Sequence, residues 1–402
     1  MSASGWTAKL NPTVRALKPS GIRRFFDLAA ETKGIISLGV GEPDFVTPWH
    51  VREASIFALE QGYTNYTPNS GIPELRREIA RYTAEFLGLE YKPESEILVS
   101  VGVSEALDLA LRAVVAPGDE VLIPEPCYVS YLPCTVLAGG VPVTVSTGIE
   151  QGFRVRAADL ERVITPRTKV LLLCYPNNPT GAVMPREELR AIAEVCAAHD
   201  LIVIADEIYA QLTYEGEHTC FAAQPGMRDR TILLQGFSKA FAMTGWRIGY
   251  ALGNADFIGA MTKIHQYTML CAPVIAQMAA LEALRNGREE MRRMVRAFSY
   301  RRRLVVKAFA DMGLPCFAPG GAFYAFPDIR STGLSSEEFT ERLIREEKVA
   351  VVPGNAFGDC GEGFIRCSYA ASVEELNEAF KRMRRFVERC RVENKNKARG
   401  FA

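Results

Sequence analysis

Short apolar runs alternate with helix-length segments through the first two thirds of this chain. The runs are bounded by glycine, proline, asparagine and aspartate, and they lie at residues 96–101, 120–123, 141–145, 169–174, 201–205 and 231–234. Continuous apolar runs of this length are typical of parallel strands buried on both faces, and the segments between them are long enough for crossover helices. The pattern predicts a doubly wound α/β domain.

The pattern changes after Gly287. An arginine-rich amphipathic stretch is followed by shorter apolar runs and two further helix-length segments, at residues 288–312, 322–326, 336–347, 350–352, 364–369 and from 372 onward. Ser335 with Glu338, and Ser372 with Glu375, have the spacing of capping boxes that open the last two helices. These features predict a smaller α+β domain, whose polar tail at 392–402 lacks apolar periodicity and is expected to fray.

Length and the change of pattern together predict two domains. A chain of 402 residues is longer than one small core usually requires. We expect residues 1–48 to form an N-terminal arm and part of the small domain, residues 49–292 the large domain, and residues 293–402 the C-terminal small domain.

Charge and cysteine usage limit the class of protein. The 47 basic and 47 acidic residues balance without a basic block, which argues against a nucleic-acid or membrane partner. The ten cysteines are spread singly with no C-x-x-C pair, as expected of buried thiols in a reducing compartment. The first 19 residues lack the apolar core of a signal peptide, and no run of eighteen apolar residues occurs. We therefore expect a soluble cytoplasmic protein.

Polar side chains follow the last three apolar runs of the large domain. Asn178 follows the first of these runs, Asp206 and Tyr209 the second, and Lys239 the third. Because the carboxyl ends of parallel strands meet at one edge of a sheet, these groups are expected to converge on one crevice. A buried amine that can attack a carbonyl, a carboxylate and two hydrogen-bonding groups suit pyridoxal phosphate. The alternatives are a solvated loop lysine, a helix N-cap at Asp206 and a turn residue at Asn178.

A phosphate site is predicted where the first run turns into a helix. Gly102, Val103 and Ser104 would open that helix, and its free amides could hold an anion together with Arg247. Ser104 alone is equally consistent with an ordinary N-cap. Tyr128 could stack on a pyridine ring, or could be a core tyrosine. No metal-binding or nucleotide-binding motif is present, so no metal is expected.

From about residue 20 to residue 390 the chain resembles the class I/II aminotransferases, which are pyridoxal phosphate enzymes of fold type I. The resemblance rests on ordered motifs at residues 37–45, 63–71, 178–181, 206–209, 238–249, 319–324, 352–354 and 366–369. It implies a mostly parallel seven-stranded sheet in the large domain. It also implies an enzyme that moves an α-amino group between an amino acid and a 2-oxo acid by a ping-pong mechanism, with 2-oxoglutarate as the expected acceptor.

The resemblance implies a role for each cofactor residue. Lys239 would bind the cofactor's aldehyde, and Asp206 would pair with its ring nitrogen. Asn178 and Tyr209 would bind the phenolic oxygen, while Tyr128 would stack on the ring. The backbone of Gly102, Val103 and Ser104 would hold the phosphate together with Arg247. Many relatives have serine or threonine three residues before the lysine, where this chain has Gly236, and Ser238 could substitute for that hydroxyl.

The resemblance also implies the substrate and partner contacts. Arg366 would bind the substrate α-carboxylate as a bidentate ligand, assisted by the backbone of Gly41 and by Asn178. Tyr66 matches a tyrosine that reaches the cofactor phosphate of the neighbouring subunit, which implies a homodimer. The partner arginine that the dicarboxylate-specific branch uses has no counterpart that we can place, so strict aspartate specificity is not expected.

The branch that fits best contains aromatic, broad-range and N-acetyl-LL-diaminopimelate aminotransferases. Segments 20–25 and 265–267 are similar to that branch, in which the N-terminal segment lies over the substrate. Ile22 and Phe25 could then set specificity, or the segment could pack only on a dimer partner. The rival activities are a pyridoxal phosphate-dependent C–S β-lyase and a cofactor-binding regulatory module without turnover, which would need an attached DNA-binding domain.

Overall fold

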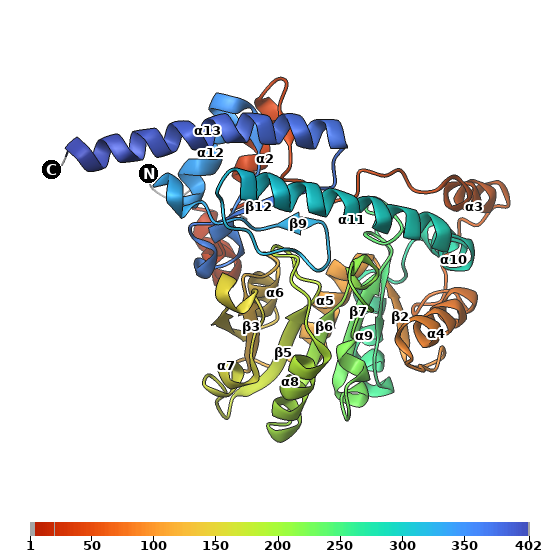
Figure 1. Cartoon of the computed structure of the whole chain (residues 1–402). Coiled ribbons are helices and arrows are strands. Elements are labelled where there is room, and N and C mark those ends of the chain that lie inside the picture. Colours follow the sequence, from red (N-terminus) through yellow and green to blue (C-terminus); the bar gives the residue numbers. More distant parts are fainter. Residues whose placement is uncertain (1–4, 20, 401–402) are drawn as a thin grey trace.

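The computed structural model describes residues 5–19 and 21–400, and the expectations that fall on residues 1–4, 20 and 401–402 lie outside it. A seven-stranded sheet with the order β2-β8-β7-β6-β5-β3-β4 forms the centre of the molecule (Figure 1). The strands are β2 (Ile97–Ser100), β3 (Glu120–Glu125), β4 (Val141–Ser146), β5 (Thr168–Cys174), β6 (Ile202–Asp206), β7 (Thr231–Gly236) and β8 (Gly249–Leu252). All six predicted apolar runs are strands, and the α/β fold class is confirmed.

Strand β8, which no predicted run covers, is antiparallel to its neighbours. It pairs antiparallel with both β2 and β7, whereas β7, β6, β5, β3 and β4 pair in parallel. The parallel order places the carboxyl ends of β5, β6 and β7 side by side, as the positions of Asn178, Asp206 and Lys239 required.

Two layers of helices cover the sheet. Helices α5 (Gly102–Val114), α6 (Tyr131–Leu137) and α9 (Ala255–Thr268) form one apolar layer with the side chains of Val170 and Leu172 on β5. The adjacent residues Leu171 and Leu173 point the other way, into a layer that includes α4 (Pro73–Leu87), α7 (Ala157–Glu161), α8 (Arg186–Ala198) and α10 (Val274–Asn286). Both faces of the strand are buried, which explains its continuous apolar sequence.

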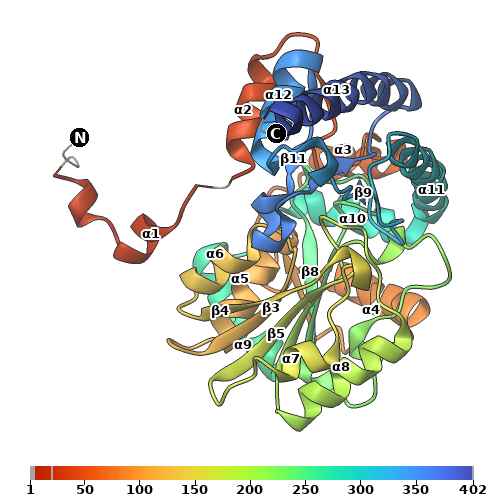
Figure 2. The ribbon, with the colours of Figure 1, turned by 60° about the vertical axis from the view of Figure 1, so that its left-hand side comes forward.

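The second part of the fold combines the C-terminal region with residues near the N-terminus. Strand β1 (Ile36–Ser37) pairs in parallel with β10 (Val349–Ala350), and α2 (Arg23–Glu31) packs against α12 (Ser336–Glu347) (Figure 2). A three-stranded antiparallel sheet has the order β11-β12-β9, formed by β11 (Val352–Pro353), β12 (Ile365–Ser368) and β9 (Tyr324–Ala325). Helix α11 (Arg288–Asp311) crosses the boundary expected at 292/293, so the division into domains stays a proposal.

The C-terminal helix corrects one prediction. The expected capping box is present, because the hydroxyl of Ser372 accepts the Glu375 N–H and the Glu375 carboxylate accepts the Ser372 N–H. Helix α13 then runs from Val373 to Gly400, so the expectation that the tail frays from residue 392 is wrong. Arg391 donates to the Met312 carbonyl at 2.7 Å, and Glu393 pairs with Arg342 at 3.1 Å. These two contacts link the start of the polar stretch to the end of α11 and to α12.

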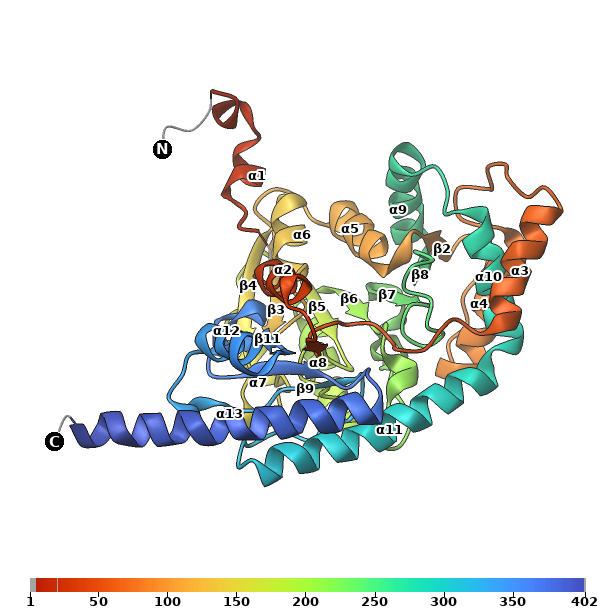
Figure 3. The ribbon, with the colours of Figure 1, turned by 90° about the horizontal axis from the view of Figure 1, so that it is seen from above.

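The N-terminal segment with α1 (Pro12–Ala16) lies at the edge of the molecule, where α1 contacts α6 (Figure 2). Seen from above, α11 and α13 lie side by side, and α3 (Trp49–Glu60) stands at the far edge against α10 (Figure 3). Within residues 5–19 and 21–400, no helix combines the length and the apolar character needed to cross a membrane.

Candidate functional site

A cavity of about 460 Å³ opens at the carboxyl ends of β5, β6 and β7, beneath the C-terminal region. It is lined by twelve residues that the sequence had singled out: Ile22, Gly41, Val103, Ser104, Tyr128, Asn178, Asp206, Tyr209, Ser238, Lys239, Arg247 and Arg366. Six further residues complete the lining: Leu107, Val129, Tyr131, Cys174, Ile208 and Tyr324. The groups expected to converge do lie together.

Lys239 lies in the loop between β7 and β8. Its Nζ donates a hydrogen bond to the Gly41 carbonyl at 2.6 Å and lies 5.9 Å from the centre of the Phe323 ring. Burial lowers the pKa of Lys239 to about 8, and the nearby Arg366 and Arg247 act in the same direction. Lys239 is therefore an amine within a pocket, not a solvated loop lysine.

Asp206 is the last residue of β6, and only 6% of it is exposed. Its Oδ2 accepts the Tyr131 hydroxyl at 2.8 Å, and its Oδ1 accepts the Ile208 N–H at 3.2 Å. Burial raises the pKa of Asp206 to about 6, against the opposing effect of these hydrogen bonds. No helix begins at this residue, so the N-cap alternative is excluded.

Arg366 comes from β12, in the C-terminal region, and is buried. Its Nη1 donates to Asn178 Oδ1 at 2.9 Å and its Nη2 to the Gly39 carbonyl at 2.6 Å. The guanidinium carbon lies 4.5 Å from the Tyr324 ring centre, while Nε finds no hydrogen-bond partner in the described chain. A guanidinium held in this way keeps donor capacity for a carboxylate.

Tyr209 and Asn178 approach the cavity from different elements. The Tyr209 hydroxyl lies 2.9 Å from that of Tyr324, and both side chains are buried. Asn178 is in the turn after β5, and its side-chain oxygen binds Arg366. Asn178 is therefore a turn residue, as the alternative interpretation stated, and its side chain also faces the site.

The predicted phosphate corner is formed by the start of α5 and by Arg247. Gly102 has φ of +77°, and a Cβ at this position would lie 2.7 Å from Arg247 Nη2. Arg247 Nη1 donates to the Thr244 carbonyl at 3.1 Å. The N-cap position is Val101, so Ser104 lies in the first turn of the helix and the simple N-cap alternative is wrong. Free amides, a hydroxyl and a guanidinium therefore meet where an anion can bind.

Close packing around Gly236, three residues before Lys239, explains why this residue is a glycine. A Cβ at Gly236 would lie 3.0 Å from Val103 Cγ2 and 3.1 Å from the Gly249 Cα. A side chain at Gly236 would therefore be accommodated only if Val103 and Gly249 moved by a few tenths of an ångström. Ser238, which precedes Lys239 in the chain, is buried and lines the cavity.

Tyr66 stands apart from the other expected residues. It is 82% exposed and does not line the cavity of its own chain. Its expected role in a neighbouring subunit stays a proposal.

Two aromatic residues of the site were not assigned a role from the sequence. Tyr131 contacts Asp206, and Tyr324 contacts both Tyr209 and Arg366. Tyr131 lies three residues after Tyr128, and Tyr324 lies within the motif at 319–324. The three-residue spacing from Tyr128 to Tyr131 was the available signal for the first.

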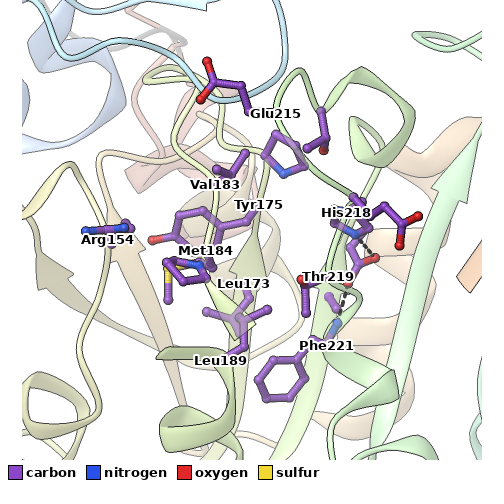
Figure 4. Close-up of a pocket in the computed structure, with 16 residues that line it drawn as sticks. Arg154, Leu173, Tyr175, Val183, Met184, Leu189, Glu215, His218, Thr219 and Phe221 are labelled. Atoms are coloured by element: carbon purple, nitrogen blue, oxygen red, sulfur yellow. Dashed lines mark hydrogen bonds and ion pairs between the residues drawn. The ribbon is translucent and has the colours of Figure 1, made fainter. Parts of the chain in front are cut away.

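A second cavity is lined in part by Leu173 of β5 and Ala205 of β6, whose side chains belong to the apolar layer with α8 (Figure 4). Its deepest polar groups are satisfied by each other, since His218 Nε2 lies 2.6 Å from Glu207, which also accepts the Phe221 N–H at 2.8 Å. The Tyr175 hydroxyl at its edge donates to the Phe153 carbonyl. This cavity is therefore a weaker candidate than the one around Lys239.

The fold and the first cavity together define a class of protein. An amine of lowered pKa, a buried carboxylate and an anion cradle at the edge of a doubly wound sheet fit pyridoxal phosphate, with Gly102 leaving space that a side chain would fill. The sequence profile of the family described as aminotransferase class I and II matches residues 33–383. The chain belongs to this family of pyridoxal phosphate-dependent transaminases.

Individual relatives agree with this assignment. The chain is 58% identical to YugH of Bacillus subtilis (strain 168), named as an aminotransferase, over 95% of this chain and 99% of that protein. It is 47% identical to an aspartate aminotransferase of Pyrococcus abyssi (strain GE5 / Orsay), over 92% of this chain and 96% of that one. The solved aromatic aminotransferase of Pyrococcus horikoshii OT3 superposes with a TM-score of 0.87 at 44% identity, covering 91% of this chain and 99% of that one.

Proposed function

We propose that this aminotransferase moves the α-amino group of an amino acid to 2-oxoglutarate by a ping-pong mechanism in the Lys239 cavity. One observation carries the proposal. The Gly41 carbonyl accepts from Lys239 at 2.6 Å, and the Gly39 carbonyl accepts from Arg366 at 2.6 Å. A single short segment of backbone thus joins the reactive amine to the candidate carboxylate anchor, which is the spatial relation that an α-amino acid requires.

The bound cofactor supplies an aldehyde that takes up the amino group and a protonated ring that accepts the electrons of the Cα–H bond. Asp206 would hold the ring nitrogen, Tyr128 the ring face, and Asn178 with Tyr209 the phenolic oxygen. The phosphate would bind at Gly102, Val103, Ser104, Ser238 and Arg247.

Lys239 would act as the general base and acid. Its pKa near 8 leaves part of the amine neutral close to neutral pH, so it can take a proton from the substrate Cα and return one. Arg366 and the Gly41 backbone would fix the α-carboxylate and so direct that proton toward Lys239. Asp206, with a pKa near 6, would be mainly ionised under the same conditions.

The walls of the cavity favour a neutral donor side chain. Its two guanidinium groups, Arg247 and Arg366, are assigned to the phosphate and the α-carboxylate, and its apolar lining includes Ile22, Val129 and Tyr324. Aspartate and the acceptor 2-oxoglutarate would each need a polar partner from outside this lining for the side-chain carboxylate, because burying an unpaired carboxylate is costly, whereas a neutral donor needs none. We therefore propose an aromatic or broad-range donor, in line with the aromatic aminotransferase of P. horikoshii, with N-acetyl-LL-diaminopimelate as the other donor to test.

A panel of donors against 2-oxoglutarate tests this proposal. We expect kcat/KM for phenylalanine or tyrosine to exceed that for aspartate by about tenfold or more. The panel should include alanine, methionine and N-acetyl-LL-diaminopimelate. Aspartate as the best donor would contradict the proposed preference for a neutral donor side chain.

We also propose a homodimer in which Tyr66 reaches the partner's phosphate site. Large apolar side chains are exposed along α3 and in two neighbouring segments, among them Trp49, Phe57, Tyr66 and Tyr267. Asn69 Nδ2 donates to the Leu270 carbonyl at 2.7 Å, so the segments that carry Tyr66 and Tyr267 lie together. Exposed apolar surface of this kind supports an interface.

A cytoplasmic location is the simplest proposal for the compartment. All ten cysteines are free thiols, and Cys127, Cys174, Cys196, Cys220, Cys367 and Cys390 are buried. Unpaired thiols are typical of proteins in reducing compartments.

A further inference from the structure

Tyr131, the first residue of α6, contacts two of the proposed cofactor ligands at once. Its hydroxyl donates to Asp206 Oδ2 at 2.8 Å. Its ring packs edge-on against Tyr128, with 5.6 Å between centroids and an interplanar angle of 78°. Only 1% of Tyr131 is exposed, so neither contact competes with bulk water.

The groups around Asp206 have opposing effects on its charge. Burial and the adjacent Glu207 raise its pKa, whereas the Tyr131 hydroxyl, the Ile208 N–H and Lys239 lower it. The Cys174 thiol also lies near and stays neutral, because burial raises its pKa far above the ordinary value. Among the contacts that favour the ionised carboxylate, the Tyr131 hydrogen bond has the largest effect.

Tyr131 itself is a dependable donor. Burial and the neighbouring Asp206 raise the pKa of its phenol well above the ordinary value, so it remains protonated over the range in which Asp206 titrates. Its hydroxyl proton is directed at one carboxylate oxygen, which leaves other lone pairs of Asp206 for a ligand.

We propose that Tyr131 is a positioning residue for cofactor binding, which keeps Asp206 ionised and oriented toward the ring nitrogen while its ring supports Tyr128. This proposal rests on the proposed roles of Asp206 and Tyr128. Without the hydroxyl, Asp206 would become protonated at higher pH and could no longer pair with a protonated ring nitrogen. Cofactor affinity would then fall as pH decreases through that raised pKa and would recover as pH increases.

The test measures binding of pyridoxal phosphate to the apoprotein of Tyr131→Phe and of the wild type from pH 5.5 to 8.5. Lys239 titrates in both proteins, so its effect on binding cancels when the two dissociation constants are divided. We expect affinity of the variant to be about tenfold weaker near pH 6, the loss that corresponds to one hydrogen bond to a charged group, and to approach the wild type above pH 8. A loss that is equal at every pH, or no loss, would overturn the proposal.

Two further variants separate this effect from a general packing defect. Tyr250→Phe removes another buried hydroxyl from the same sheet, one that donates to Gln235 at 3.0 Å, and should leave the affinity unchanged at every pH. In an Asp206→Asn background, which has no charge to preserve, Tyr131→Phe should add no pH-dependent loss. If Tyr131→Phe still causes a pH-dependent loss of affinity in that background, Asp206 is not the group through which Tyr131 acts.

The outcome is independent of the donor assignment. A wild type that transfers amino groups, combined with a Tyr131→Phe variant whose affinity ratio does not change with pH, would contradict this inference alone. Absence of amino transfer by the wild type would instead contradict the proposed function.

Discussion

At the scale of the residue, Lys239 combines reactivity with a cost in stability. Burial lowers its pKa from the ordinary 10.5 to about 8, so the unfolded chain binds the proton more tightly than the folded chain does. Between these two values the unfolded chain carries more protons, and stability therefore rises with pH. Below about pH 8 the folded protein bears the full penalty of a buried ammonium group.

Replacing Lys239 by methionine should therefore stabilise the apoprotein. We expect Lys239→Met to raise the free energy of unfolding by about 2 kcal/mol at pH 7 and to lose this advantage as pH approaches 10.5. Urea unfolding of wild type and variant at equal protein concentration would measure the difference.

Lys307→Met is the matched control, since Lys307 is an exposed lysine of α11 that pairs with Asp311. It should give no such gain. Equal stability of Lys239→Met and the wild type at pH 7 would mean that Lys239 carries no buried charge.

Side-chain contacts within the site were harder to predict than its members. Lys239, Asp206 and Asn178 could be found because each follows a recognisable apolar run. The role of Tyr131 could not be found in this way, because it depends on the first residue of α6 reaching Asp206 at the end of β6. The reason for glycine at Gly236 likewise appears only when Val103 and Gly249 are seen to enclose it.

At the scale of the element, the start of α5 depends on a glycine. Gly102 has a positive φ and lies against the guanidinium of Arg247, so alanine at this position meets both backbone strain and a steric clash. The start of α5 and the Arg247 guanidinium can therefore lie close together only because residue 102 has no side chain.

Gly102→Ala should weaken binding of pyridoxal phosphate by about tenfold or more, because it displaces Arg247 from the proposed phosphate site. The affinity of the apoprotein for the cofactor, followed by absorbance, would measure this. Gly88→Ala is a stringent control, since Gly88 also has positive φ at a helix end but has open space around it. It should lower stability by about 1 kcal/mol and leave affinity unchanged. Equal affinities for Gly102→Ala and Gly88→Ala would remove Gly102 from the phosphate site.

Elements with a strong apolar pattern were predicted well, and the others were not. Most of the six runs stand out because both faces of the strand are buried, although the edge strand β4 is largely exposed or half-buried. Strand β8 was not among the predicted runs, because Gly249–Leu252 is only four residues long and begins with a glycine. The continuation of α13 past residue 391 was missed, because Arg391 and Glu393 contact distant partners, which local periodicity does not reveal.

At the scale of the whole molecule, the cavity of one chain lacks Tyr66. If Tyr66 serves the partner's site, two defective variants should complement each other when their subunits exchange. In a hybrid of Tyr66→Ala with Lys239→Ala, one site would contain both the intact lysine and the intact tyrosine.

Unfolding and refolding an equal mixture of the two variants should therefore restore activity. About half of the dimers would be hybrids with one complete site of two, which gives about a quarter of wild-type activity. Each variant refolded alone is the control for refolding yield. Activity no higher than the mean of the two separate variants would show that Tyr66 does not serve a neighbouring subunit.

The central claim is that Lys239 is the residue to which the cofactor's aldehyde binds. The most direct measurement is reduction of the cofactor-loaded protein with borohydride, followed by proteolysis and mass spectrometry of the peptides. We predict a single pyridoxyl group, with its phosphate, on Lys239. Its presence on any other lysine, with Lys239 unmodified, would contradict the account.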